Sequence, residues 1–194
     1  LVIKGSCDGS DEVITQDVLL TVENGVEIGG MIKEDMTLYP DVHYIVTKNL
    51  AIPKGVTLTI KPGTKLEFKN TYFSNKGTIH AVGKPDSLIV LEGINGNSVM
   101  FTGFEYVEVN NSEIDYINGI MKNFIMHNIR CSQSLGSSLI ERSNFYNNGL
   151  GSGVGYGPFK NCNFTQATNL YPQISLYFNI ASFENSNIWN NKYM

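Results

Sequence analysis

Apolar and polar residues alternate along the first half of the chain, and proline and glycine interrupt the alternation at regular places. One nine-residue template occurs three times, as LTVENGVEI (20–28), LAIPKGVTL (50–58) and LTIKPGTKL (58–66). A period of two on either side of the glycine is typical of strands with one buried face. Pro53 and Pro62 lack a backbone donor, and Gly55 and Gly63 tolerate positive φ, so we predict corners between strands at these positions.

The second half of the chain contains five units that each place two apolar residues five positions apart. The units are VNNSEI (109–114), FIMHNI (124–129), IERSNF (140–145), FKNCNF (159–164) and FENSNI (183–188). Successive strand residues point to opposite faces, so two residues an odd number apart are both buried only if the chain bends between them. Asn111, Asn161 and Asn185 stand at the expected bend, and asparagine tolerates a left-handed backbone well.

Repeated strands and corners predict a solenoid, in which each turn buries one face against its neighbours. No stretch demands the 3.6-residue period of a helix, so we predict an all-β fold, a right-handed parallel β-helix with turns about 4.8 Å apart. Its first turns should run from Tyr39 to Gly93, and the β-helix domain should cover 36–194. Residues 1–35 should form an N-terminal β capping element or the remains of a preceding repeat, because an open sheet edge needs a cover.

Alignment of the five units on their apolar residues predicts which side chains share a column. We expect the first apolar residue of every unit inside: Val109, Phe124, Ile140, Phe159 and Phe183. The same alignment places His127 in a structural column with Ser112, Ser143, Cys162 and Ser186.

The residue after the second apolar position should point outward, which defines a column of Asp115, Arg130, Tyr146, Thr165 and Trp189. Aromatic and charged groups on a flat sheet suit a glycan, because rings contact the apolar side of a sugar and polar groups bind its hydroxyls. We therefore take Asp115, Arg130, Tyr146 and Trp189 as candidate ligand-binding residues. A mixed solvent-facing strand with a stabilising aromatic ladder is the alternative.

Composition narrows the class of protein. Only 16% of the 194 residues are charged and the net charge is -4, so no basic surface is available to neutralise nucleic-acid phosphates. No apolar run is long enough to span a bilayer. The chain begins at Leu1 and not at methionine, so we expect it to be a mature or excised portion of a longer protein.

Three cysteines, Cys7, Cys131 and Cys162, show no spacing typical of a metal site, so we predict no metal. The alignment puts Cys131 and Cys162 two turns apart, roughly 9.6 Å along the axis, which is too far for a disulfide.

The phrases YIVTKNLAIPKGVTLTIKPGTKLEF (44–68) and GTIHAVGKPDSLIVLEG (77–93) resemble the opening turns of right-handed parallel β-helix proteins of the pectin-lyase-like superfamily, especially bacterial and archaeal surface proteins. Beyond residue 105 the resemblance is general and rests on asparagine- and serine-rich turns. It implies an extracellular or cell-surface location. The functions of the superfamily are diverse, so the fold does not carry one of them.

Enzymes of that superfamily use carboxylate clusters. Pectate lyases bind calcium through Asp and Glu and use a basic residue to abstract a proton, whereas polygalacturonases use paired aspartates. The acidic residues beyond residue 100 contain no DD or DxD pair; they are Glu105, Glu108, Glu113, Asp115, Glu141 and Glu184. A site scattered over several turns leaves no local motif, so catalysis stays open on this ground.

The leading hypothesis is a non-catalytic extracellular or cell-surface module that binds polysaccharide or serves as a spacer in an adhesin-like protein, with no cofactor. The alternative is a polysaccharide lyase or glycoside hydrolase acting on acidic polysaccharide, with calcium as a possible cofactor. The chain ends directly after a turn, with no helical cap, so we expect either truncation or end-to-end self-association.

Overall fold

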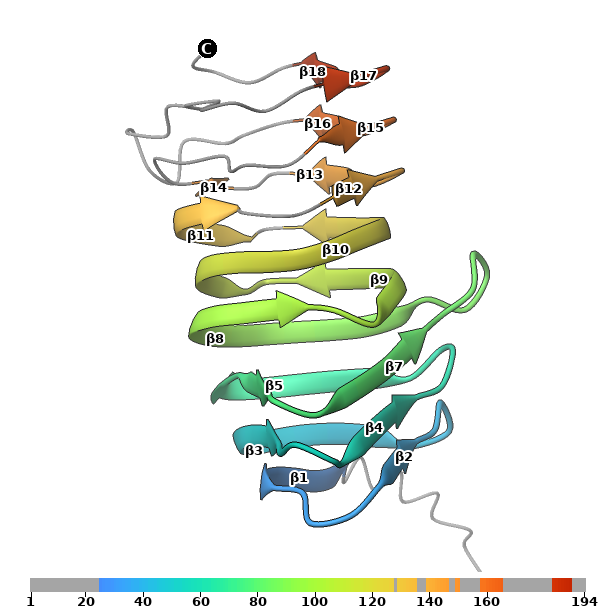
Figure 1. Ribbon diagram of the computed structural model, residues 1–194, viewed down its shortest axis with the longest axis vertical. Coiled ribbons are helices and arrows are strands. Elements are labelled where there is room, and N and C mark those ends of the chain that lie inside the picture. Colours follow the sequence, from blue (N-terminus) through green and yellow to red (C-terminus); the bar gives the residue numbers. More distant parts are fainter. Residues whose placement is uncertain are drawn as a thin grey trace, which may run out of the picture.

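The structure is a computed structural model that describes residues 25–127, 129–135, 139–146, 149–150, 158–165 and 183–189. Every regular element among these residues is a β-strand, and the strands pair in parallel. The chain rises from β1 to β18 in stacked turns (Figure 1). The predicted all-β fold of stacked parallel turns, a parallel β-helix, is confirmed.

The strands are short where the chain bends often and longer where one strand continues through a bend. They are β1 (Val26–Met31), β2 (Met36–Leu38), β3 (His43–Ile52), β4 (Thr57–Ile60), β5 (Lys65–Thr71), β6 (Phe73–Asn75), β7 (Thr78–Val82), β8 (Ile89–Phe101), β9 (Phe104–Asn110), β10 (Glu113–His127), β11 (Arg130–Leu135), β12 (Leu139–Glu141), β13 (Asn144–Tyr146), β14 (Gly149–Leu150), β15 (Phe159–Lys160), β16 (Asn163–Thr165), β17 (Phe183–Glu184) and β18 (Asn187–Trp189).

Each turn has three faces, which we name by the strands that stack on them. Face 1 contains β2, β4, β7, the start of β9, the middle of β10, β12, β15 and β17. Face 2 contains the starts of β1 and β3, β5, the start of β8, the ends of β9 and β10, β13, β16 and β18. Face 3 contains the ends of β1 and β3, β6, the end of β8, the start of β10, β11 and β14.

Inward side chains of the three faces form one continuous apolar core. On face 1 the strand pairing stacks buried residues turn upon turn, namely Leu38, Ile60, Ala81 and Phe104, then Met121, Ile140 and Phe159. Aromatic rings fill the middle of the core, where the Phe101 ring lies 5.3 Å from that of Phe124 and 5.5 Å from that of Phe104 between centroids. Burial of this apolar surface is the main force that holds the turns together.

A residue with a left-handed backbone bends the chain from face 1 to face 2 in five successive turns. These residues have φ between 49° and 56° and are Tyr106, Asn123, Arg142, Asn161 and Asn185. At Arg142 a buried polar side chain, that of Ser143, follows the bend. The Ser143 hydroxyl accepts the N–H of Phe124 at 3.2 Å, donates to the Glu141 carbonyl at 2.9 Å, and so joins two turns.

The bend from face 2 to face 3 uses the same local chemistry. Asn111 has a φ of 47°, and the following Ser112 hydroxyl accepts the N–H of Ile94 at 3.0 Å and donates to the Asn110 carbonyl at 2.7 Å. Positive φ at the predicted asparagines is therefore confirmed, as it is at Gly55 and Gly63. The asparagines, however, serve two different corners of the turn.

Because the two corners look alike in sequence, the predicted register is wrong for the first two of the five units. Met121, and not Phe124, pairs with Ile140, which makes MKNFIM (121–126) the counterpart of IERSNF. Val109 pairs with Met126. Val109, Phe124, Ile140 and Phe159 are buried as expected, yet they do not form one column; only Ile140, Phe159 and Phe183 stack directly. His127 stacks with Asn110 and Tyr146, and not with the serines.

The predicted lack of a Cys131–Cys162 disulfide is confirmed, because Cys162 is a free, buried thiol. The reason differs from the expected one. Cys131 pairs with Leu150 on face 3, and Cys162 lies in the turn that follows Leu150, at the corner between faces 1 and 2. The two cysteines are therefore separated by face as well as by turn. Burial raises the pKa of the Cys162 thiol above its usual value. Cys7 lies outside the described residues.

The first described strand already belongs to the solenoid. β1 pairs in parallel with β3, from Val26 opposite Tyr44 to Met31 opposite Ala51. It falls within the segment 1–35 that we expected to cap the fold. The rest of the expected cap, residues 1–24, lies outside the described part of the chain.

Candidate functional site

Charged side chains of alternating sign run along the corner between faces 1 and 2. Strand pairing aligns five of them in successive turns, and we name this set the charge ladder: Glu105, Lys122, Glu141, Lys160 and Glu184. The Lys160 ammonium lies 3.1 Å from the Glu184 carboxylate, and that of Lys122 lies 4.0 Å from Glu141. Arg142 also pairs with Glu141. These charges neutralise one another from turn to turn and do not converge on a cavity.

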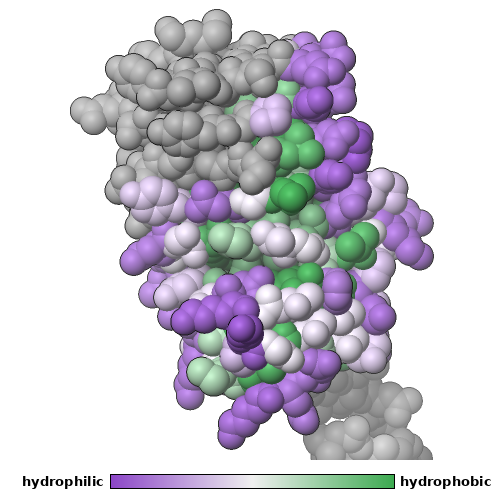
Figure 2. All heavy atoms as spheres, viewed as in Figure 1, coloured by the Kyte–Doolittle hydropathy of each residue, from purple (hydrophilic) through white to green (hydrophobic). Residues whose placement is uncertain are grey.

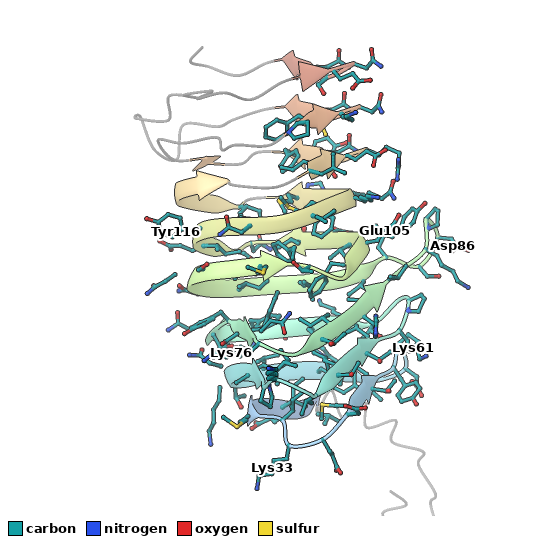
Figure 3. The ribbon with its side chains drawn as sticks, viewed as in Figure 1. Lys33, Lys61, Lys76, Asp86, Glu105 and Tyr116 are labelled. Atoms are coloured by element: carbon teal, nitrogen blue, oxygen red, sulfur yellow. The ribbon has the colours of Figure 1, made fainter. Side chains whose placement is uncertain are left out.

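The figures show where this ladder lies. Hydrophilic side chains gather along one edge of the turns that carry β12, β13 and β15 to β18, at the upper right of the view in Figure 2. Glu105 begins the ladder on that side, whereas Tyr116 points outward from the opposite side (Figure 3). Tyr116 is 44% exposed on face 3 and pairs in register with Ser98 and Ser134.

Three asparagine amides lie in line on face 2, directly after the bend. Asn144, Asn163 and Asn187 are in register across β13, β16 and β18. The Asn163 amide donates to the Asn144 oxygen at 2.7 Å, and the Asn187 amide donates to the Asn163 oxygen at 3.0 Å. Such a ladder stabilises the stack, and it also presents a polar line along the solenoid axis.

An aromatic column runs beside the amides, two residues further along each strand. The rings of His127 and Tyr146 stack at 4.9 Å between centroids, with 14° between their planes. Thr165 and Trp189 follow in the same column by strand register. Because each of the two stacked rings covers one face of the other, their outer edges, and not the shared faces, are left for a ligand.

We call these two parallel columns the amide–ring strip. It consists of Asn144, Asn163 and Asn187 in one column and of His127, Tyr146, Thr165 and Trp189 in the other.

The structure brings together only part of the predicted outward column. Tyr146, Thr165 and Trp189 share one column on face 2, as expected from their sequence. Arg130 begins β11 on face 3, where it pairs with Glu113 and Gly149. Asp115 also lies on face 3, in β10, where the register with β11 shifts. The expected single column is therefore wrong for Asp115 and Arg130, and His127 takes the place assigned to Arg130.

Sequence reasoning missed the amide ladder, although its signal was present. The fifth position of the last three units is asparagine each time, in IERSNF, FKNCNF and FENSNI. The contribution of His127 could not be read in the same way, because it depends on the corrected register.

Toward the N-terminus, the ring column continues into acidic residues. His127 is in register with Asn110 in the turn below. Asn110 is in register with Glu92, and Glu92 with Glu67. A hydrogen bond from Lys69 is the main cause that lowers the pKa of Glu67. A hydrogen bond with Glu92, at 2.9 Å, is the main cause that raises the pKa of Lys65. Each of the two carboxylates in this part of face 2 is thus paired with a lysine.

No other feature of the described residues forms a better candidate for a binding site. A shallow hollow of about 420 Å³ borders the first turn and is lined in part by Glu27, Lys33 and Asp35. Among the residues that the structure describes, no three His, Cys, Asp or Glu side chains gather closely enough to hold a metal ion. The same part of the chain contains no helix that could cross a membrane.

Comparisons with models of protein families, with curated proteins and with solved structures found no match for this chain.

Proposed function

We propose that this protein is a non-catalytic, extracellular or cell-surface β-solenoid module of the pectin-lyase-like type, which binds polysaccharide along the amide–ring strip. The observation that carries the proposal is the line of three asparagine amides, hydrogen-bonded from turn to turn beside an aromatic column. Hydroxyl groups of a glycan both donate and accept hydrogen bonds, as amides do. A flat line of such groups suits an extended polymer better than a small ligand, which needs an enclosing pocket.

The arrangement of charged groups supports a binding role over catalysis. General acid and base catalysis needs two titratable groups that face one reacting bond. The carboxylates of the charge ladder are instead spaced along the axis, where Glu141 and Glu184 pair with cations from adjacent turns and Glu105 accepts a hydrogen bond from the Asn123 amide. The same rigid stack of turns would serve as a spacer in a longer surface protein.

Binding and turnover are tested together. The chain is mixed with a panel of soluble and insoluble polysaccharides, and its retention is compared with that of a Tyr146→Ala/Trp189→Ala double variant. We expect retention of the wild type by at least one polymer and weaker retention of the variant. Uronic-acid polymers are assayed in parallel for unsaturated or reducing ends, with and without calcium. Release of such products would refute the non-catalytic proposal.

A further inference from the structure

We propose that the amide–ring strip is selective for uncharged polysaccharide, aligned with the solenoid axis so that one sugar residue lies on each turn. The inference rests on the proposed function and specifies its ligand class. The inference also argues against an acidic polysaccharide as the ligand, because an acidic polymer would need unpaired cations on this face and an uncharged polymer would not.

The charge of the strip carries the first step. Asparagine, threonine and tryptophan have no ionisable side chain, and they make up five of the seven residues of the strip. The cations nearest in sequence, Arg142 and Lys160, are already paired with Glu141 and Glu184. A uronate would therefore find no uncompensated cation among the described residues of this region. It would also meet Glu108, which is in register with Ile125 at the N-terminal end of the amide column.

Hydrogen-bond capacity carries the second step. An amide has two N–H donors and an oxygen with two lone pairs. At Asn163 the ladder uses one N–H and one lone pair, in the bonds to Asn144 and from Asn187. One donor and one acceptor thus lie outside the ladder. A hydroxyl group can satisfy both, whereas a carboxylate only accepts and would leave the amide oxygen without a donor.

Spacing carries the third step. Turns of a parallel solenoid repeat about every 4.8 Å. A sugar residue in an extended chain advances by a similar distance, so successive sugars would meet equivalent amides. The stacked edges of His127 and Tyr146 would border the polymer on one side.

The experiment measures retention on neutral polymers (cellulose, mixed-linkage glucan and galactomannan) and on acidic ones (polygalacturonate and alginate), at low salt. We expect retention on at least one neutral polymer and none on the acidic polymers. Asn163→Ala should weaken neutral binding roughly 2- to 10-fold, because the amide contact of one turn is lost. An Asn144→Ala/Asn163→Ala/Asn187→Ala triple variant should abolish it.

The matched control is Asn95→Ala on face 3, which also loses an amide bond between turns, to Asn70. It should bind as the wild type does. Far-UV circular dichroism and thermal unfolding check the fold, and Asn187→Ala, at the last described turn, replaces the triple variant if that variant unfolds.

The outcomes separate the two proposals. Preference for acidic polymers, lost in the strip variants, would overturn the inference of an uncharged ligand and leave the proposed function intact. If the strip variants bind neutral polymers as well as the wild type does, the amide–ring strip is not the binding site, and this inference is overturned. Retention on no polymer at all would overturn both proposals.

Discussion

Replacement of Ser143 by alanine tests the hydrogen-bond chain that holds successive turns together. Ser143 is fully buried at the corner between faces 1 and 2, and its hydroxyl accepts the backbone N–H of Phe124 at 3.2 Å. The chain continues, since the Cys162 thiol donates to the Ile140 carbonyl of the turn below at 3.5 Å and the Ser186 hydroxyl accepts the N–H of Cys162 at 3.1 Å.

Alanine removes the acceptor and leaves the N–H of Phe124 buried without a partner. The cost of such a group is about 1–3 kcal/mol, so we expect the free energy of unfolding to fall by about 2 kcal/mol. A thiol is a weaker acceptor than a hydroxyl, yet Cys162 fills the same position one turn away, so Ser143→Cys should lose less than alanine does.

Urea unfolding followed by circular dichroism gives the global change, and amide hydrogen exchange at Phe124 gives the local one. Ser98→Ala is the control, because Ser98 is exposed on face 3 and its loss should change stability by less than about 0.5 kcal/mol. If Ser143→Ala unfolds like the control and exchange at Phe124 is not accelerated, the hydrogen-bond chain does not stabilise the stack and the reasoning fails.

Three further changes test the core, the bend and the surface charges. Phe101→Ala should lower the free energy of unfolding by about 3–5 kcal/mol in urea titrations, because Phe101 is fully buried among other rings; a loss below about 1 kcal/mol would contradict this packing. Tyr106→Asn should raise the melting temperature, since a left-handed backbone at φ 54° costs most residues about 1–2 kcal/mol and asparagine less; an unchanged or lower value would count against a strained bend. The pKa of Glu67 is lowered in the folded state, so its contribution to stability is present above its ordinary pKa and lost as pH falls through the lowered value. Unfolding measured from neutral to strongly acidic pH should therefore show a smaller loss in Glu67→Gln than in the wild type, and parallel curves would exclude this contribution.

Much of the fold was predictable because local chemistry repeats along the chain. Strand alternation, the corner glycines Gly55 and Gly63, and the left-handed asparagines were all readable, since each depends on residues within a few positions of one another. These features determine that the chain winds into stacked parallel strands.

Which residues become vertical neighbours was decided only by the tertiary structure. The corner after Val109 and the corner after Ile140 have the same pattern of an apolar residue, a left-handed residue and a small polar residue. Sequence alignment therefore could not tell a corner between faces 2 and 3 from one between faces 1 and 2. Packing against the turns below resolves the choice: it places Met121 under Ile140, brings His127 beside Tyr146, and leaves Asp115 and Arg130 on another face. The physical reason is that a solenoid corner is specified locally, whereas its register is set by the long-range pairing of whole turns.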